Sequence, residues 1–195
     1  MKTIGITGGI GCGKSMVLNM IFENYNVSIA EADKVGHEVM QKGMEAYEKI
    51  VQYFGTDILD EDKNIDRAVL GKIVFKDKEK LEKLNSFVHP AVKNEIVRRQ
   101  QLAKAENKDF FVIEAALLIE AGYRDICDKF AYIYASEDIR RDRLKKSRNL
   151  TDEKIDEIMS NQLTEQEFED ACDVKINNTG NKEETLEEIK KVLVV

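Results

Sequence analysis

Gly8-Gly9-Ile10-Gly11-Cys12-Gly13-Lys14-Ser15, residues 8–15, is the stretch that decides the fold of this 195-residue chain. It matches the pattern GxxxxGK[ST] at every specified position and stands between a strand-like segment, 2–7, and a helix-like segment, 14–24. Glycines let a backbone turn tightly enough for successive N–H groups to point at phosphate oxygens, and a helix start adds positive charge. The stretch therefore predicts a phosphate-binding loop, or P-loop. The alternative is a glycine-rich turn that contains Gly-Lys-Ser by chance.

Two side chains at the end of this stretch predict the ligand. Lys14 can reach the β- and γ-phosphates of a nucleotide as a point charge, and the Ser15 hydroxyl can ligate the Mg²⁺ that bridges those phosphates. We therefore expect ATP as a co-substrate and Mg²⁺ as the cofactor.

Outward from this loop, strand-like and helix-like segments alternate to the end of the chain. Residues 110–113 and 130–135 are continuous apolar runs of strand length, which is typical of a parallel sheet covered on both faces. Further strands are expected at 2–7, 27–30 and 174–176, and helices at 14–24, 34–54 (broken at Gly43), 66–75, 77–105 (interrupted at His89-Pro90), 136–148, 151–171 and 182–193. This order predicts an α/β fold with five parallel strands, and a side lobe from the long helical insertion between the second and third strands.

Composition narrows the class of protein. The net charge of −7 argues against non-specific nucleic-acid binding, and no stretch approaches the length of apolar sequence that a membrane span needs. The N-terminus lacks a signal-peptide pattern. Three widely spaced cysteines, Cys12, Cys127 and Cys172, suggest neither a disulfide framework nor a zinc site. We expect a cytoplasmic protein with free thiols, and expect Cys12 to be a small residue tolerated in the loop.

Three classes of nucleotide-binding protein remain: a small-molecule kinase, a GTPase switch and a binding module. A GTPase usually carries Asn-Lys-x-Asp on a late strand, but Asn181-Lys182-Glu183-Glu184 lacks the aspartate. A kinase needs a group to deprotonate the acceptor hydroxyl. Glu31 and Asp33 lie at the expected carboxyl end of the second strand, where strand alternation would aim both at one side. From position alone, Asp33 is equally a catalytic base or a helix cap.

A kinase also needs cations around the transferring phosphoryl group, and one helix-like segment supplies them. Six basic residues crowd it: Arg140, Arg141, Arg143, Lys145, Lys146 and Arg148. Arg140 and Arg143 are three apart and share a helix face. Arginine grips phosphate oxygens with a planar fork, so we favour a lid over ATP, although most charge runs are solvated helix faces.

With these residues identified, the chain resembles the dephospho-CoA kinase family over nearly its whole length. Ile4-Gly5-Ile6-Thr7-Gly8-Gly9-Ile10-Gly11 followed by Gly13-Lys14-Ser15 is similar to the start of that family's P-loop. The resemblance continues at Glu31-Ala32-Asp33, Ile65-Asp66-Arg67, His89-Pro90, Leu117-Leu118, Arg143-Leu144, Gln162, Asp173, Ile176, Asn178 and Gly180. It implies ATP-dependent phosphorylation of the ribose 3′-hydroxyl of dephospho-CoA, giving CoA and ADP.

The resemblance also implies a fold and a division of the chain. The fold is a nucleoside-monophosphate-kinase-like, three-layer P-loop kinase in a single domain. Its core covers about 1–32, 108–135 and 172–195, its helical acceptor lobe about 33–107, and its lid about 136–171. Implied partners are ATP and dephospho-CoA, with no nucleic acid and no membrane, in a monomer or weak homo-oligomer.

Site residues follow from the same resemblance, with Asp33, Lys14 and Arg143 as the catalytic set. The implied ATP site comprises Gly8, Gly9, Ile10, Gly11, Cys12, Gly13, Lys14, Ser15, Met16, Arg140, Asn178 and Gly180, with the last two beside the adenine. The implied acceptor site comprises Thr7, Asp33, Arg67, His89 and Leu117, although His89 is equally a structural residue that caps a helix turn before Pro90.

Some positions depart from the family's pattern. Glu31 stands where the family has aspartate, Glu114-Ala115-Ala116 where Asp-x-Pro is usual, and Arg140 where glutamine is usual. These departures affect the lid and turnover more than nucleotide binding. Two alternatives therefore stay open: a kinase of the same fold acting on another nucleotide-like or sugar acceptor, and a non-catalytic ATP-binding relative.

Overall fold

The computed structural model describes residues 1–119 and 121–194, so Val195, the last residue of the predicted core, lies outside it. The chain forms two compact units, Met1–Ala30 with Gln100–Val195, and Glu31–Arg99. The second unit is the helical insertion between the second and third strands. Within the described residues, none of the helices combines the length and apolarity needed to cross a membrane.

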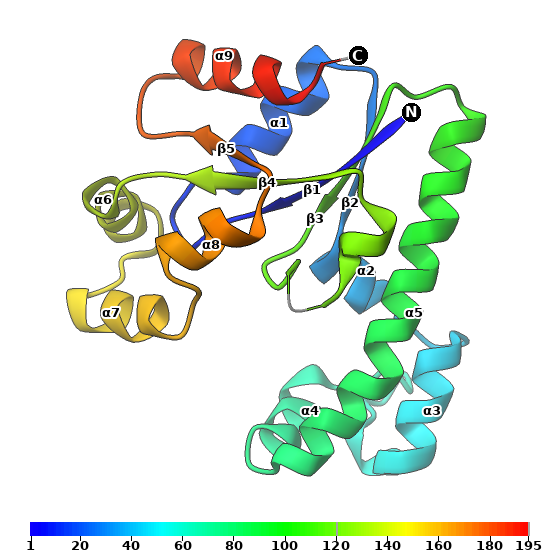
Figure 1. Cartoon of the computed structure of the whole chain (residues 1–195). Coiled ribbons are helices and arrows are strands. Elements are labelled where there is room, and N and C mark those ends of the chain that lie inside the picture. The colour runs from blue at the N-terminus through cyan, green and yellow to red at the C-terminus, as the bar shows by residue number, and fades with distance from the viewer. Residues whose placement is uncertain (120, 195) are drawn as a thin grey trace. The chain divides into compact units, whose positions relative to one another are not determined.

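A five-stranded sheet forms the centre of the first unit, in the order β2-β3-β1-β4-β5 (Figure 1). The strands are β1 (Lys2–Thr7), β2 (Val27–Glu31), β3 (Phe110–Glu114), β4 (Lys129–Tyr134) and β5 (Val174–Asn177). β1 pairs in parallel with β3 and with β4, and β4 pairs in parallel with β5. Every residue of β3 is buried, as expected for a strand covered on both faces. The predicted α/β class and the five strands are confirmed.

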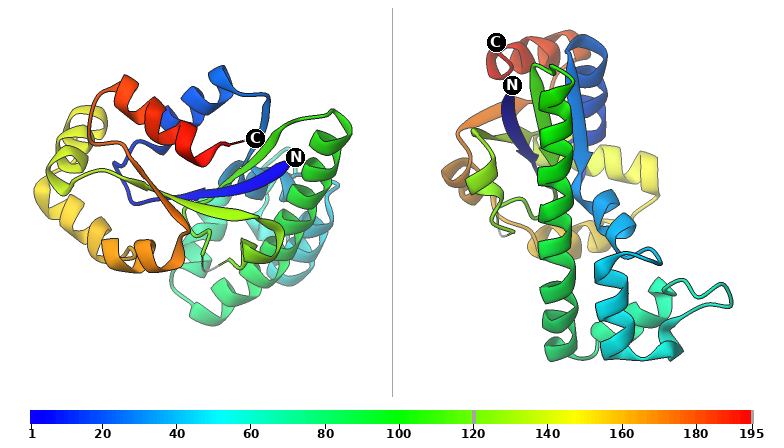
Figure 2. Two further views of the ribbon diagram at one scale, coloured as in Figure 1. Left: turned by 45° about the horizontal axis from the view of Figure 1, so that its top comes forward. Right: turned by 90° about the vertical axis from the view of Figure 1, so that its right-hand side faces the viewer.

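Helices cover both faces of this sheet (Figures 1 and 2). On one face, α1 (Lys14–Asn24) and α9 (Lys182–Val192) pack together, and Val17, Ile21 and Ile189 join the strands in one apolar core. On the other face, α8 (Glu165–Ala171) places Phe168 against Tyr132 of β4, with parallel rings 4.7 Å apart. The unit therefore has three layers. α6 (Glu137–Arg148), α7 (Asp152–Ser160) and the 3-10 turn η2 (Tyr123–Ile126) complete it.

The second unit has its own apolar core. It contains α2 (Ala32–Val39), α3 (Glu45–Phe54), the 3-10 turn η1 (Thr56–Ile58), α4 (Arg67–Val74) and the part of α5 (Lys78–Ala105) up to residue 99. Ile50, Ile58, Leu70 and Val74 are buried together, and Leu84 of α5 packs against them. Apolar residues three and four apart on each helix account for this core.

Three local expectations were wrong. Helix α5 runs without a break through Pro90, so the expected interruption at His89-Pro90 is absent and His89 is an exposed mid-helix residue, not a cap. The segment 151–171 forms two helices, because Thr164 and Glu167 make a capping box that starts α8. Asp33 is neither at a strand end nor a cap: β2 ends at Glu31, and Asp33 lies in the first turn of α2.

Candidate nucleotide and acceptor sites

The loop 8–15 joins β1 to α1 in the conformation that the motif predicts. Gly11 and Gly13 have φ of 79° and 89°, in the left-handed region that favours glycine. Gly13 is also the N-cap of α1, and a Cβ there would collide with the side-chain nitrogen of Asn178. The backbone therefore needs glycine at this position for two reasons, conformation and space. Ser15 is exposed and Met16 half-buried in the first turn of α1.

Lys14 lies across this loop. Its Nζ donates a hydrogen bond to the carbonyl oxygen of Gly8 (2.8 Å) and lies 3.9 Å from Oε1 of Glu114. Glu114 ends β3, which neighbours β1 in the sheet, and is 8% exposed. The sequence singled out Glu114 only as a departure from a family pattern. An acidic residue at the end of a continuous apolar strand could have marked Glu114 as a site residue. The carboxyl ends of parallel strands lie at the same edge of the sheet, which is where ligands bind in such folds.

The first half of the loop is held by side chains from the predicted lid. Arg140 of α6 donates from Nε to the carbonyl oxygen of Ile10 (2.8 Å), and the Ile10 N–H donates to Oε1 of Gln162 (2.8 Å). A Cβ on Gly9 would lie 2.6 Å from a guanidinium nitrogen of Arg140. Arg140 therefore lies directly beside the loop.

The second half of the loop is held by four residues that we name the Cys12 network: Cys12, Arg143, Asn178 and Thr185. The carbonyl oxygen of Cys12 accepts hydrogen bonds from Nδ2 of Asn178 (2.7 Å) and Nη1 of Arg143 (3.2 Å). Nη2 of Arg143 donates to the carbonyl oxygen of Asn178 (2.9 Å). The Thr185 hydroxyl lies 2.9 Å from Oδ1 of Asn178 and donates to it. Asn178 and Thr185 are fully buried.

This network bears on the expectation that Asn178 and Gly180 lie beside the adenine. The side chain of Asn178 is occupied by the Cys12 carbonyl and by Thr185. Its backbone is bonded within the protein as well, because its N–H donates to the carbonyl oxygen of Tyr134 and its carbonyl oxygen accepts from Arg143. Gly180 precedes α9 on the surface, and a Cβ there would collide with the carboxylate of Glu184. Thr185 was not expected from the sequence, because threonine inside a helix carries no motif.

Three other cations of α6, Arg141, Lys145 and Lys146, form ion pairs with acids. Arg141 pairs with Glu137 and Asp156, and Lys145 pairs with Asp152 at 2.7 Å. The basic run therefore divides into two sets, with Arg140 and Arg143 on the loop and the others on the solvated face. The shared face predicted for Arg140 and Arg143 is confirmed by their hydrogen bonds to the loop.

The Cys12 thiol is protonated at neutral pH. Cys12 is 2% exposed, and its burial raises the pKa of its thiol, although Lys14, Arg140 and Arg143 act in the opposite direction. A reactive cysteine needs an exposed thiolate. Cys12 therefore serves the loop through its carbonyl oxygen, which agrees with the interpretation of a small tolerated side chain.

Predicted acceptor residues occur in both units. In the first unit, Thr7 is fully buried, with its hydroxyl 3.5 Å from the carbonyl oxygen of Ala116, and Leu117 is 60% exposed in the turn after β3. In the second unit, Asp33 is exposed on α2, and Arg67 starts α4 with Nη1 3.5 Å from Nδ1 of His37 on α2. His89 is exposed on α5 of the same unit.

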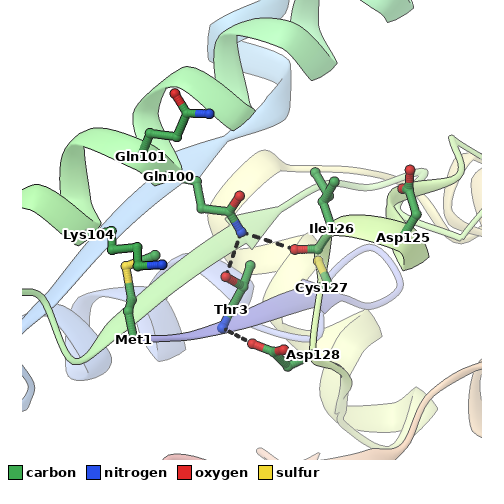
Figure 3. A pocket seen from close by; sticks show the side chains of 9 residues that line it. All are labelled: Met1, Thr3, Gln100, Gln101, Lys104, Asp125, Ile126, Cys127 and Asp128. Atoms are coloured by element: carbon green, nitrogen blue, oxygen red, sulfur yellow. Dashed lines mark hydrogen bonds between the residues drawn. The ribbon is translucent and has the colours of Figure 1, made fainter.

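The first unit also has a hollow at the opposite edge of the sheet, where β1 and β4 begin (Figure 3). It has a volume of about 440 Å³. Its polar groups bond to one another: Nε2 of Gln100 donates to the hydroxyl of Thr3 (2.7 Å), and the Thr3 N–H donates to Asp128 (2.7 Å). Burial raises the pKa of the Cys127 thiol in this hollow to about 12, so it is inert. The hydrogen bonds join β1, α5 and the start of β4, which is a structural role.

Comparisons with known proteins show the family to which the chain belongs. The family model described as dephospho-CoA kinase matches residues 2–184. A dephospho-CoA kinase from Aquifex aeolicus (strain VF5) is 40% identical over 193 residues, 98% of this chain and 96% of the relative. The structure of a dephospho-CoA kinase from Campylobacter jejuni is similar with a TM-score of 0.73 and 30% identity, covering 99% of this chain and 96% of that one.

A more distant structure shares the fold alone. A shikimate kinase from Acinetobacter baumannii in complex with shikimate is 14% identical, with a TM-score of 0.55 over 99% of this chain and 93% of that one. The P-loop kinase fold expected from the sequence is therefore confirmed by kinases that differ in their acceptors.

Proposed function

The chain belongs to the dephospho-CoA kinase family, and on that premise we propose the residues with which it carries out the ATP-dependent phosphorylation of dephospho-CoA to CoA. The proposal rests on one observation above all. A P-loop with Lys14 lying across it occurs in a chain that matches this family over residues 2–184.

In this proposal the first unit binds ATP. The N–H groups of residues 8–15 and the positive end of α1 bind the phosphates, and Lys14 exchanges its bond to the Gly8 carbonyl for phosphate oxygens. Arg140 lies beside Gly9, and Arg143 keeps donors beyond the two it uses in the Cys12 network. These cations offset the negative charge of the transferring phosphoryl group.

We propose Mg²⁺ as the cofactor, held by the Ser15 hydroxyl, with the Glu114 carboxylate, 3.9 Å from Lys14, as a second oxygen donor. Both are oxygen donors of the kind that Mg²⁺ prefers. A site with few protein ligands fits Mg²⁺, which keeps water and phosphate oxygens around it. When bound, it would neutralise phosphate charge.

We propose Asp33 as the general base and the second unit as the acceptor side. The Asp33 carboxylate takes the proton of the ribose 3′-hydroxyl as that oxygen bonds to the γ-phosphorus. The bond from the γ-phosphorus to the β–γ bridging oxygen breaks, and ADP leaves. Asp33 suits this role because its carboxylate is exposed in the first turn of α2.

The test is ADP release with Mg-ATP and dephospho-CoA, for the wild type and Asp33→Asn. We expect release that depends on dephospho-CoA, yields CoA, and falls by about 10²–10⁴-fold in the variant, the typical contribution of a general base. ADP affinity should be the same in both proteins. Release that occurs only with another nucleotide or a sugar would reassign the acceptor, and an unchanged rate in the variant would remove Asp33 from the mechanism.

We further propose that the protein works in the cytosol, as a monomer or weak homo-oligomer, without nucleic acid or membrane. Three free cysteines fit a reducing compartment, and the net charge of −7 disfavours polyanions.

A further inference from the structure

Gln162 holds the backbone of Ile10 in the phosphate-binding loop, although 152 residues separate the two in the sequence. Its Oε1 accepts from the Ile10 N–H at 2.8 Å, and Nε of Arg140 donates to the Ile10 carbonyl oxygen at 2.8 Å. Both backbone polar groups of Ile10 therefore bond to side chains of the predicted lid. The ATP site proposed above includes Arg140 and gives Gln162 no role.

The turn that carries Gln162 is supported on both sides. It follows α7, whose Ile155 is fully buried, and the Gln162 N–H donates to the carbonyl oxygen of Met159 at 3.1 Å. It precedes α8, which starts at the capping box of Thr164 and stacks Phe168 on the sheet. A side chain supported in this way is held in place before a ligand arrives. The fold therefore sets the position of the Gln162 amide.

The hydrogen bond to Ile10 also fixes which way this amide faces. A backbone N–H can only donate, so the Gln162 atom beside it is Oε1, and the other end of the amide is the Nε2 group with two donors. Among residues 1–119 and 121–194, Nε2 of Gln162 has no hydrogen-bond partner. In the same residues no buried side-chain nitrogen or oxygen lacks a partner, so Nε2 is open to solvent. Gln162 therefore offers two unused donors beside the loop.

Ile10 lies at the end of the loop that the γ-phosphate of ATP would occupy. In a loop of this motif, the backbone N–H groups cradle the α- and β-phosphates and the lysine reaches the β- and γ-phosphates. Nζ of Lys14 lies 2.8 Å from the carbonyl oxygen of Gly8, so its charge is at the first half of the loop. Ile10 belongs to that half. A donor held at Ile10 is therefore placed for the γ-phosphate.

We propose that Gln162 is a further residue of the transfer site, which donates from Nε2 to an oxygen of the γ-phosphoryl group while its Oε1 stays on the Ile10 N–H. The inference rests on the proposed function, because it takes residues 8–15 as the ATP site. The neutral amide adds donors where Arg140 adds charge. Because ADP lacks the γ-phosphate, Gln162 distinguishes ATP from ADP and links the lid to the group that is transferred.

The test compares ATP with ADP in two variants of Gln162. Gln162→Glu keeps an oxygen for the Ile10 N–H and loses the Nε2 donors, whereas Gln162→Met has a similar length and loses both. The same two substitutions at Gln166 are the controls, because Gln166 is exposed on α8 and donates to Asp170. Titration calorimetry with Mg²⁺ gives the Kd of ADP and of a non-hydrolysable β,γ-imido analogue of ATP. Rates with dephospho-CoA give kcat/KM for ATP.

In both Gln162 variants we expect the Kd of the ATP analogue to rise and kcat/KM for ATP to fall, each about tenfold, the effect of losing one hydrogen bond to a charged group. The Kd of ADP should stay within about threefold of the wild type, because salt screens the added charge of Gln162→Glu. Both Gln166 variants should match the wild type.

Four results would each overturn the proposal. Equal weakening of ADP and the analogue would mean that Gln162 only holds the loop. Tighter binding of the analogue by Gln162→Met would mean that ATP displaces the side chain. A normal Gln162→Glu beside a weakened Gln162→Met would mean that the bond to Ile10 is sufficient, and no change in either variant would mean that Gln162 has no part in binding.

The wild type separates this inference from the proposed acceptor. If it binds both nucleotides but releases no ADP with dephospho-CoA, the proposed acceptor is wrong, and the ratio of the two Kd values still decides the role of Gln162. If it binds neither nucleotide, the proposed function and this inference are both overturned.

Discussion

Replacing Thr185 by valine removes one hydroxyl from the Cys12 network and keeps the shape of the side chain. Thr185 lies on α9 and does not belong to the loop, yet its hydroxyl is 2.9 Å from Oδ1 of Asn178, whose Nδ2 donates to the Cys12 carbonyl. Both residues are fully buried, so the variant leaves a buried acceptor without its donor. The free energy of unfolding should fall by about 1–3 kcal/mol.

Part of this loss should appear in nucleotide binding. If the Cys12 network holds the loop in its binding conformation before ADP arrives, the loop of the variant is less ordered, and part of the binding free energy of ADP is used to order it. If about 1–2 kcal/mol of the lost free energy appears in binding, the Kd for ADP rises about 5- to 30-fold. We expect ADP and GDP to weaken by the same factor, because Thr185 acts on the phosphate loop and not on the base. Titration calorimetry gives both values of Kd, and Thr185→Ser should restore them.

The control is Ile189→Val, a fully buried residue on the same helix whose loss of a methylene costs about 1 kcal/mol. It should lower the unfolding free energy without changing ADP affinity. If Thr185→Val behaves in the same way, the network is only structural and our reasoning is refuted. A change in the ratio of ADP to GDP affinity would show instead that Asn178 reads the base.

Three other outcomes are expected. Glu114→Gln should raise the Mg²⁺ concentration that gives half the maximal rate about tenfold, because the carboxylate lies beside the loop, 3.9 Å from Lys14. The affinity for ADP, measured without Mg²⁺, should stay constant. An unchanged Mg²⁺ requirement would exclude Glu114 from the metal site. The hydrogen bonds from Arg124 lower the pKa of Asp173 from 3.8 to about 2, so the pair stabilises the folded state above pH 3.8 and its contribution is lost as pH falls towards 2. Asp173→Asn should therefore lower the free energy of unfolding by roughly 1 kcal/mol at pH 7, because the pair is partly exposed, and by much less at pH 2. Urea unfolding of both proteins at the two pH values checks this. Pro90→Ala should stabilise the protein by about 1–3 kcal/mol, since α5 is continuous there and proline removes a backbone donor, whereas a destabilised variant would mean that the ring itself packs in the helix.

Much of this architecture could be predicted from the residues because it depends on patterns of short range. The apolar run 110–113 predicts a buried strand, and β3 extends it by one residue to Glu114. The motif 8–15 predicts a loop between a strand and a helix, and both are present. At the boundary between β2 and α2, a shift of one residue changes the direction in which a site residue points. Because α2 begins at Ala32, Asp33 points according to helical geometry and not according to strand alternation.

The Cys12 network could not be predicted, because it depends on where distant side chains point. Asn178 follows the edge strand β5, and nothing in its spacing says whether its amide faces a base or a backbone carbonyl. The division of 151–171 into two helices was predictable in principle. Thr164 and Glu167 have the spacing of a capping box, and this signal outweighs the helix propensity of the residues around it.

The loop that binds phosphate is completed by side chains far along the chain. Cys12 and Asn178 are 166 residues apart, and Ile10 and Gln162 are 152 apart. On a ribosome that adds roughly 5–20 residues per second, the motif emerges on the order of ten to thirty seconds before the residues that fix it. During that interval the glycines at 11 and 13 are unconstrained. The chain therefore reaches its full affinity for ATP only late in synthesis, so nucleotide binding indicates that the N-terminal loop has packed against the C-terminal segment.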